Sequence, residues 1–556
     1  MKVIGFTVGH DKGAVLIDNG KIIAGISQER LTRIKHDGGY SGGSIPLSSI
    51  LYCLNYAGLK FSDIDLWGYS TTELVDDVSE KMNEILGYDL GNRLLFVPHH
   101  LAHAYSSFFS SDFDEAAVIV ADASGSIYSP KNKLFGLYNL DTSKLLSGQE
   151  ISEGISIYKF NRTSYSEVYK KWINLPHEWD GEEESTSLGA RYSEGCLQLV
   201  YEPSNHSWSA GKLMGMASYA KKTELEKYPL LVKELENDIH IPNKRILPGV
   251  RWNSDFYSKC TVAGLYQREQ EQASLILARI AKNLTQSNNV CVAGGSFLNC
   301  NSNRLIIDSN LFEGCYFIPP SDDSGVPLGC AWFAYQKVSI IGQETFLNPY
   351  LGKEYTRNEI VSALNLFPNL KVREYDGLEM LIEEISEKLL ENKIVGWFHG
   401  GSEIGPRALG NRSILANPTE KWITNYINSE VKMREWYRPF APAVLYEKQS
   451  EIFDTTFYSP YMLVTADVND EWKDRIPAVV HIDGSSRYQS VTEFSNKKFY
   501  DLISQFYKIS GIPVLLNTSF NGPEEPIVET PENAINTFLK RNIDFLVIEN
   551  FIISKN

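Results

Sequence analysis

Residues 116–125 read Ala-Ala-Val-Ile-Val-Ala-Asp-Ala-Ser-Gly, an apolar run that ends in an acidic, glycine-containing loop. Residues 290–296 follow the same pattern, because Val-Cys-Val-Ala leads into Gly-Gly-Ser. Short apolar runs bounded by turn residues are typical of buried strands. In α/β folds, ligands bind at the loops that follow the carboxyl ends of such strands. The sequence therefore predicts an α/β fold whose functional site includes these two loops.

The surrounding sequence indicates two domains, because 556 residues are too many for a single core. The predicted elements are strands at 2–8, 14–17, 22–26, 394–398 and 545–548 and helices at 273–284 and 378–389. Asp18-Asn19-Gly20 is a type I′ hairpin signal between the first strands. The pattern becomes irregular around 342–376, so we place the domains at 1–345 and 346–556.

The composition limits the partners of the chain. The formal net charge of −16 argues against nucleic acid, because phosphate contacts need a strongly basic face. No apolar run is long enough to span a bilayer, and the first strand turns polar at His10-Asp11-Lys12, unlike a signal peptide. The seven cysteines include no CxxC pair, which favours a reducing compartment. We expect a cytoplasmic protein that binds neither nucleic acid nor membrane.

Two histidines four residues apart form the first candidate site. In the segment 97–104, a helix would place His99 and His103 on one face, where neutral imidazoles suit a divalent metal. Carboxylates for such a metal are available in Asp122 and Asp323, which begin glycine-containing loops. The alternative is structural: His99 caps the helix and His103 is a hydrogen-bonded core residue, as isolated HxxxH matches often are.

A basic, glycine-rich region forms the second candidate site. Residues 400–413 follow a predicted strand and place Arg407 and Arg412 in a turn whose glycines let backbone N–H groups approach an anion. Further polar and basic residues follow at Lys432, Arg434, Arg438, Arg487 and 517–521. Because guanidinium groups bind phosphate in a bidentate manner, the cluster suggests a multiply anionic ligand such as ATP with a second phosphate. The alternative is a solvated basic face or structural Arg–Glu pairs.

Together these motifs resemble the NodU/CmcH family of carbamoyltransferases over nearly the whole chain. The resemblance is carried, in order, by residues 9–11, 28–37, 97–104, 211–217, 294–300, 323–325, 405–413, 437–442, 481–484 and 517–521. Three departures stand out: Gln28 replaces a glutamate, the Asp122 loop lacks the usual Asp-Gly, and Lys12-Gly13 replaces a small residue and serine. The third departure lies near the acceptor site that the resemblance implies and is compatible with a different acceptor.

The resemblance implies a fold and a reaction. Residues 1–345 would form an actin/Hsp70-like (ASKHA) ATPase-type domain and residues 346–556 a YrdC-like α/β domain. The YrdC-like domain would form carbamoyladenylate from carbamoyl phosphate and ATP. The first domain would transfer the carbamoyl group to a hydroxyl of a small-molecule acceptor, a natural product or sugar. The metal of the family is iron, Fe(2+), although the residues also suit Mn or Zn, and Mg(2+) would accompany ATP.

The resemblance also assigns roles residue by residue. The metal ligands would be His99, His103, Asp122 and Asp323. His10 would act at the acceptor, and Arg407, Lys432 and Arg438 would act in adenylate formation, with Arg487 and Ser519 also binding the substrates. Lys212, Gly294, Gly295 and Asn299 would belong to the nucleotide-binding surface of the first domain.

Other functions use related folds. A threonylcarbamoyl-tRNA-type modification enzyme would need a basic tRNA-binding face, against which the net charge of −16 argues. A catalytically inactive ATP-binding sensor would not need all four candidate metal ligands. A sugar kinase would leave the second half of the chain unexplained. The sequence thus favours carbamoyl transfer and does not name the acceptor.

Overall fold

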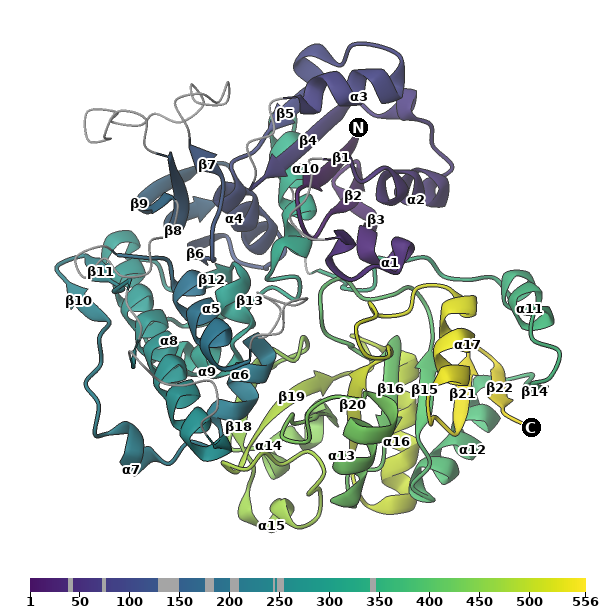
Figure 1. Cartoon of the computed structure of the whole chain (residues 1–556). Helices are drawn as coiled ribbons and strands as arrows, with labels where there is room; N and C mark the ends of the chain where they lie inside the picture. Colours follow the sequence, from purple (N-terminus) through teal and green to yellow (C-terminus); the bar gives the residue numbers. More distant parts are fainter. Residues whose placement is uncertain are drawn as a thin grey trace. The chain divides into compact units, whose positions relative to one another are not determined.

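A computed structural model describes residues 1–38, 44–72, 77–128, 150–175, 185–200, 210–243, 246–247, 255–340 and 347–556 (Figure 1). The chain divides into two units, of which the first comprises Met1–Gln28 and His36–Leu347. The second comprises Glu29–Lys35 and Asn348–Asn556. The predicted boundary after residue 345 falls within 341–346, outside the described residues.

The N-terminal strands form a five-stranded sheet in the order β3-β2-β1-β4-β5. Its strands are β1 (Lys2–Val8), β2 (Gly13–Asp18), β3 (Lys21–Ser27), β4 (Leu66–Thr71) and β5 (Leu94–Phe96). β1, β2 and β3 are antiparallel, whereas β4 and β5 continue the sheet in parallel. Asn19 and Gly20 have φ of 48° and 78°, as a type I′ turn requires, so the predicted hairpin is confirmed.

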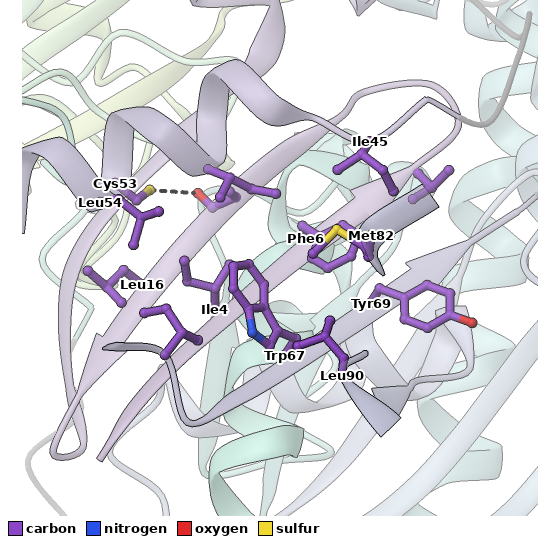
Figure 2. Close-up of a cluster of buried hydrophobic side chains, with 14 of the residues drawn as sticks. Ile4, Phe6, Leu16, Ile45, Cys53, Leu54, Trp67, Tyr69, Met82 and Leu90 are labelled. Atoms are coloured by element: carbon purple, nitrogen blue, oxygen red, sulfur yellow. Dashed lines mark hydrogen bonds between the residues drawn. The ribbon is translucent and has the colours of Figure 1, made fainter. Parts of the chain in front are cut away.

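One face of this sheet packs under α2 (Leu47–Ala57) in a cluster of buried apolar side chains (Figure 2). Ile4 and Phe6 alternate along β1 and point to this face, together with Trp67 of β4. Cys53 of α2 covers them, and its thiol lies 3.6 Å from the carbonyl oxygen of Ala14. Since α2 closes this face, the opposite face is left for a second layer of helix.

The second sheet of the first unit repeats the first. Its strands are β6 (Glu115–Ala121), β7 (Ile127–Tyr128), β8 (Glu150–Asn161), β9 (Tyr165–Leu175), β12 (Asn289–Ala293) and β13 (Gly314–Phe317). β6 pairs antiparallel with β8, and β8 with β9, while β12 and β13 follow in parallel on the other side. The order β9-β8-β6-β12-β13 thus matches β3-β2-β1-β4-β5, strand for strand and in direction. β7 is an additional strand that pairs with β8. This duplicated α/β arrangement agrees with the expected actin/Hsp70-like class.

Two buried helices pack against each other and against these sheets (Figure 1). α10 (Val326–Gln336) covers β1 and β4, and α4 (His99–Phe109) covers β6 and β12. α10 is apolar on nearly every side, as expected of a helix buried all round. The helices approach closely at Gly329, where a Cβ would lie 1.7 Å from the carbonyl oxygen of Ala102. Their N-terminal ends carry the metal-site candidates.

The remaining elements of the first unit surround the sheets. They are α1 (Gln28–Thr32), which spans the unit boundary, α3 (Val78–Leu86), α5 (Leu188–Leu199), α6 (Ala210–Ala217), α7 (Lys222–Leu225), α8 (Phe256–Thr285), α9 (Cys300–Asp308), β10 (Lys233–Leu235) and β11 (Asp238–His240). The helix predicted at 273–284 is confirmed but forms only the second half of α8.

The second unit contains a nine-stranded mixed sheet in the order β14-β22-β21-β15-β16-β20-β17-β19-β18. Its strands are β14 (Lys371–Glu374), β15 (Val395–Phe398), β16 (Arg412–Ala416), β17 (Ala441–Leu445), β18 (Val464–Asp467), β19 (Ser485–Val491), β20 (Val514–Ser519), β21 (Phe545–Ile548) and β22 (Phe551–Ser554). Its helices are α11 (Arg357–Asn365), α12 (Leu378–Leu390), α13 (Trp422–Tyr426), α14 (Gln449–Ile452), α15 (Asp470–Lys473), α16 (Lys497–Ser510) and α17 (Pro531–Lys540). The predicted helix at 378–389 and the strands at 394–398 and 545–548 are confirmed, and a further strand, β22, follows the last of these. The YrdC-like identity of this unit stays a prediction.

A short N-terminal segment, Glu29–Lys35, completes the second unit. Arg30 donates a hydrogen bond to the carbonyl oxygen of Gly405 at 2.7 Å. Arg33 donates to the carbonyl oxygens of Pro526 and Ile527, both at 2.7 Å. The second unit therefore consists of two separate stretches of the chain, which a single boundary between domains does not describe.

Within the described ranges, no helix combines the length and the apolar character that crossing a membrane requires.

Candidate functional site

The two histidines predicted to share a helix face do so on α4. The helix begins at His99, directly after Pro98, so His99 and His103 lie one turn apart at its N-terminal end. Their rings meet edge to face with centroids 4.7 Å apart, and the two Nε2 atoms are 3.1 Å apart. Both side chains are buried. The two imidazoles therefore direct the same ring nitrogen at one point.

Two carboxylates complete this group. Asp122 directly follows β6, and Asp323 opens a 3-10 turn that leads into α10. Asp323 Oδ1 lies 3.3 Å from both Nε2 atoms. Asp122 Oδ2 lies 3.6 Å from His99 Nε2 and 3.4 Å from His103 Nε2. The structure thus brings the four predicted ligands, from three segments of the chain, within 4.8 Å of one another.

The charges of this group, the four-ligand cluster, favour a cation. Burial alone would lower the pKa of His99, but the carboxylates of Asp323 and Asp122 outweigh burial and raise it to about 10. Burial opposes ionisation of Asp323, but His99 and His10 outweigh it and hold the pKa of this carboxyl well below its usual range. Two imidazoles and two carboxylates at one buried point are a donor set that fits iron, manganese or zinc.

His10 lies at the edge of the four-ligand cluster. Its Nε2 is 3.4 Å from Asp323 Oδ2, and its Nδ1 is 3.2 Å from Asp11 Oδ2. The other oxygen of Asp11 lies 2.7 Å from Nδ1 of His36. Burial lowers the pKa of His10, but Asp323 and Asp11 outweigh burial and raise it to about 9. With 15 % of its side chain exposed, His10 is accessible to a bound molecule.

The glycine loop after β12 adjoins the four-ligand cluster. Gly294 has φ of 96°, and a Cβ there would lie 2.2 Å from the carbonyl oxygen of Ala121, so only glycine fits. A Cβ on Gly295 would lie 3.3 Å from Asp122 Oδ1. The two glycines therefore let the chain pass close beside the loop that carries Asp122.

The other two residues predicted to contact a nucleotide in the first unit have different surroundings. Asn299 is buried and caps α9, since its Oδ1 accepts a hydrogen bond from the Ser302 N–H at 3.2 Å. The same side chain pairs with the amide of Gln267. Lys212 is half-buried on α6. The contacts of Asn299 are those of a side chain that holds a helix in place.

In the second unit, a buried carboxylate shapes the loop that carries Arg407. Glu403 Oε1 accepts hydrogen bonds from the backbone N–H groups of Leu409, Asn411 and Arg412 at 2.7, 3.1 and 3.2 Å. Glu403 itself is buried. Because three donors converge on one oxygen, the turn around Arg407 is held in a defined shape.

Lys432 is held by the end of β20. Its Nζ donates to Ser519 Oγ at 3.1 Å and to the Ser519 carbonyl oxygen at 2.8 Å. It also donates to Asn521 Oδ1 at 2.6 Å. Burial lowers the pKa of Lys432 well below its usual range, and the charges of Arg434 and Arg438 lower it further. Lys432 and Ser519, each predicted to act on the substrates, are thus in direct contact.

Arg434 lies among the other predicted cations. Burial lowers the pKa of its guanidinium, and the charges of Arg438, Arg487 and Arg407 lower it further, against partial opposition from Glu435. These four arginines and Lys432 form what we call the cationic pocket. Of these five cations, only Arg434 lines a cavity of about 350 Å³, whose other lining residues, Asn425, Asn428, Ser429 and Trp436, are uncharged. Several like charges in a partly desolvated place repel one another, so the cationic pocket favours an anionic ligand.

Comparison with known protein families decides the identity of the chain. The family model described as "Carbamoyltransferase N-terminus" matches residues 2–85 and 86–332, and "Carbamoyltransferase C-terminus" matches residues 386–555. The chain belongs to the carbamoyltransferase family. The resemblance to NodU/CmcH enzymes, predicted from the motifs, is therefore confirmed.

Relatives of this carbamoyltransferase match it along most of its length. The nodulation protein NolNO of Sinorhizobium fredii is 30% identical and covers 99% of this chain and 79% of its own. An uncharacterized protein of Methanocaldococcus jannaschii is 28% identical over 100% of this chain and 99% of its own. Among solved structures, full-length HypF in a phosphate- and nucleotide-bound form shares 14% identity and a TM-score of 0.36 over 61% of this chain and 55% of its own.

Sequence reasoning did not assign roles to several residues that shape the sites of this carbamoyltransferase. Glu403 holds the loop that carries Arg407, and Asp11 and His36 adjoin His10. All three lie inside the motifs singled out in the sequence, which is the signal that could have found them. A motif does not say which side chains contact one another, so the roles of these residues follow only from the three-dimensional structure.

Proposed function

We propose that this carbamoyltransferase joins the carbamoyl group of carbamoyl phosphate to AMP in its second unit and delivers it to a small-molecule hydroxyl in its first. The observation that carries the proposal is the convergence of His99, His103, Asp122 and Asp323 on one buried point beside His10. The cationic pocket of the second unit supplies independent support, because it suits a triphosphate and a carbamoyl phosphate.

The second unit would form the adenylate. Carbamoyl phosphate, ATP and one water give carbamoyladenylate, phosphate and pyrophosphate. Arg407, Arg438 and Arg487 would bind and orient the phosphate groups, since guanidinium groups match phosphate oxygens in a bidentate manner. Lys432, fixed by Ser519, would offset negative charge that develops as pyrophosphate leaves. The loop that Glu403 holds in shape would keep Arg407 in position before the substrates bind.

The first unit would transfer the carbamoyl group. The acceptor oxygen attacks the carbamoyl carbon, the bond to the AMP oxygen breaks, and the hydroxyl proton is lost. His10 is the candidate to take that proton, because it is accessible and touches Asp323. Since its pKa is raised to about 9, it can do so only in its deprotonated form, whose share grows as the pH rises. A divalent metal, iron in the resembling family, would act at the four-ligand cluster as a Lewis acid toward the carbonyl or phosphate oxygen. The acceptor class proposed is a natural product or sugar.

The division of labour predicts a split between two assays. His99→Ala should abolish carbamoylation of the acceptor and leave ATP–pyrophosphate exchange in the presence of carbamoyl phosphate within about twofold. Arg407→Ala should lower that exchange by about 100-fold or more, since removing a preorganised charge from a developing anion costs this much. Product formation is followed by mass spectrometry with a panel of hydroxylated acceptors.

Two matched variants control for general damage. His240→Ala removes a histidine of β11 in the first unit, and Arg357→Ala removes an exposed arginine of the second unit. Both should behave as wild type in both assays. Loss of pyrophosphate exchange in His99→Ala would contradict the assignment of the two steps to two units.

A further inference from the structure

Glu153 joins two segments that carry the four-ligand cluster. It lies in β8, and its side chain is fully buried. Its Oε2 accepts a hydrogen bond from the backbone N–H of His100 at 3.1 Å and another from that of Ser126 at 3.0 Å. His100 is the second residue of α4, and Ser126 ends the loop that begins at Asp122. One carboxylate oxygen thus holds the histidine helix and the aspartate loop together.

Backbone and hydroxyl contacts reinforce this junction. The Gly125 N–H donates to the Glu153 carbonyl oxygen at 2.8 Å, and the Glu153 N–H donates to that of Ser126 at 3.2 Å. Ser126 Oγ accepts from the backbone N–H of His99 at 3.0 Å. A Cβ on Gly125 would lie 2.7 Å from the ring of His100 and 2.8 Å from Glu153. The segments therefore meet with no spare room.

Lys170 of β9 balances the charge of Glu153. Its Nζ lies 2.6 Å from Glu153 Oε1 and 2.9 Å from Oε2 of the exposed Glu167. Burial raises the pKa of Glu153, but the charge of Lys170 outweighs burial and, together with the hydrogen bond from the His100 backbone N–H, lowers it to about 2. Glu153 is therefore ionised and can only accept hydrogen bonds, which suits the two backbone donors.

We infer that Glu153 is a positioning residue for the metal: by accepting both N–H groups, it fixes His99 and His103 relative to Asp122. The inference rests on the metal site of the proposed function and not on the identity of the acceptor or the adenylate. Outer residues that orient ligands change metal affinity by about 10- to 100-fold when they are lost. The hydrogen-bond and ion-pair partners of the Glu153 side chain are the backbone of His100 and Ser126 and the ammonium of Lys170, so its effect on the ligands passes through the backbone.

The test separates two properties of Glu153: its ability to accept hydrogen bonds from the backbone and its negative charge. In the full chain, Glu153→Leu/Lys170→Met replaces the ion pair with apolar groups, which a buried site often tolerates. It also removes the oxygen that accepts the two backbone hydrogen bonds. Glu153→Gln/Lys170→Met is equally neutral and keeps an oxygen that can accept both N–H groups. Each protein is stripped with a chelator and titrated with Co²⁺, with visible absorption as the readout and circular dichroism as the check on folding.

We expect the leucine pair to bind Co²⁺ about 10- to 100-fold more weakly than wild type and the glutamine pair to bind within about threefold of it. Glu167→Gln, which removes the other carboxylate from Lys170, is the matched control and should bind as wild type. Wild-type affinity in the folded leucine pair would overturn the inference and leave the proposed metal site intact. If the leucine pair does not fold, weak binding by the folded glutamine pair overturns it. A wild-type chain that binds no Co²⁺ would overturn the metal site and the inference together.

Discussion

Single side chains at the two sites face opposite electrostatic demands. Around His99, two carboxylates outweigh burial and hold the ring pKa high, at about 10. Around Lys432, burial and neighbouring arginines depress the pKa of the ammonium. The first environment attracts positive charge and the second attracts negative charge. Each site is therefore prepared for one sign of ligand before any ligand arrives.

His100, between the two metal-site histidines, gives a pH-dependent prediction. Burial lowers the pKa of its ring to about 3, so it folds as the neutral form. The unfolded state, with an ordinary histidine pKa, binds a proton first as the pH falls, and stability is lost from about pH 6.5 downward. Between pH 7 and pH 5, wild type should lose about 2 kcal/mol more stability than His100→Gln.

Urea unfolding of the first unit at both pH values, followed by near-ultraviolet circular dichroism, measures this difference. Because the variant keeps every other titrating group, their contributions cancel in the comparison. Equal losses in the two proteins would show that His100 is not held in its neutral form.

At the scale of elements, the helix pair α4 and α10 carries most of the four-ligand cluster. α4 supplies His99 and His103, and the turn before α10 supplies Asp323. Their close approach depends on Gly329, because no side chain fits against the carbonyl oxygen of Ala102. Packing of two helices thus sets a distance between ligands that lie 220 residues apart in sequence.

Gly329→Ala should therefore affect both stability and metal binding. The added Cβ forces the helices apart, which costs about 3 kcal/mol or more by overpacking. We expect a lower unfolding temperature of the first unit in differential scanning calorimetry and weaker Co²⁺ binding. Gly377→Ala is the control, because a Cβ there meets nothing within 4 Å. An unchanged transition in Gly329→Ala would show that the helices tolerate a wider separation.

Local patterns allowed the individual elements near the sites to be predicted. The Asn19-Gly20 signal gave the hairpin, since few residues adopt two successive positive φ values. The four-residue spacing of His99 and His103 placed both on one face of a helix, because the period of a helix is fixed. Apolar runs that end in polar loops placed Asp122 and Gly294 after strands.

Arrangements that depend on contacts distant in sequence could not be predicted in the same way. The motifs do not reveal that the two sheets of the first unit share one strand order, because strand order is set by pairing between segments that are distant in sequence. Glu153 looks like an ordinary strand residue, and only its buried contacts with His100 and Ser126 distinguish it. The family resemblance supplied the candidate roles that local patterns left open.

At the scale of the whole molecule, the 29–35 segment makes the second unit dependent on the N-terminal part of the chain. Arg30 is buried and donates to the carbonyl oxygen of Gly405, in the loop that carries Arg407. Arg30→Met removes this charge-assisted hydrogen bond, worth about 1.5–3 kcal/mol. We expect ATP–pyrophosphate exchange to fall by about tenfold.

Arg93→Met, which alters an arginine beside Tyr88 in the first unit, is the control and should leave exchange unchanged. Exchange at the wild-type rate in folded Arg30→Met would mean that the Gly405 loop keeps its shape without help from the N-terminal segment.

The position of the 29–35 segment also bears on how the chain folds during synthesis. Arg30 leaves the ribosome 375 residues before Gly405, its hydrogen-bond partner. At the usual pace of translation, the segment waits for roughly 20–75 seconds before its binding site exists. During that interval its buried arginine is exposed to water and to chaperones. The second unit can reach its final form only after Gly405 and the strands that pack around it have been synthesised.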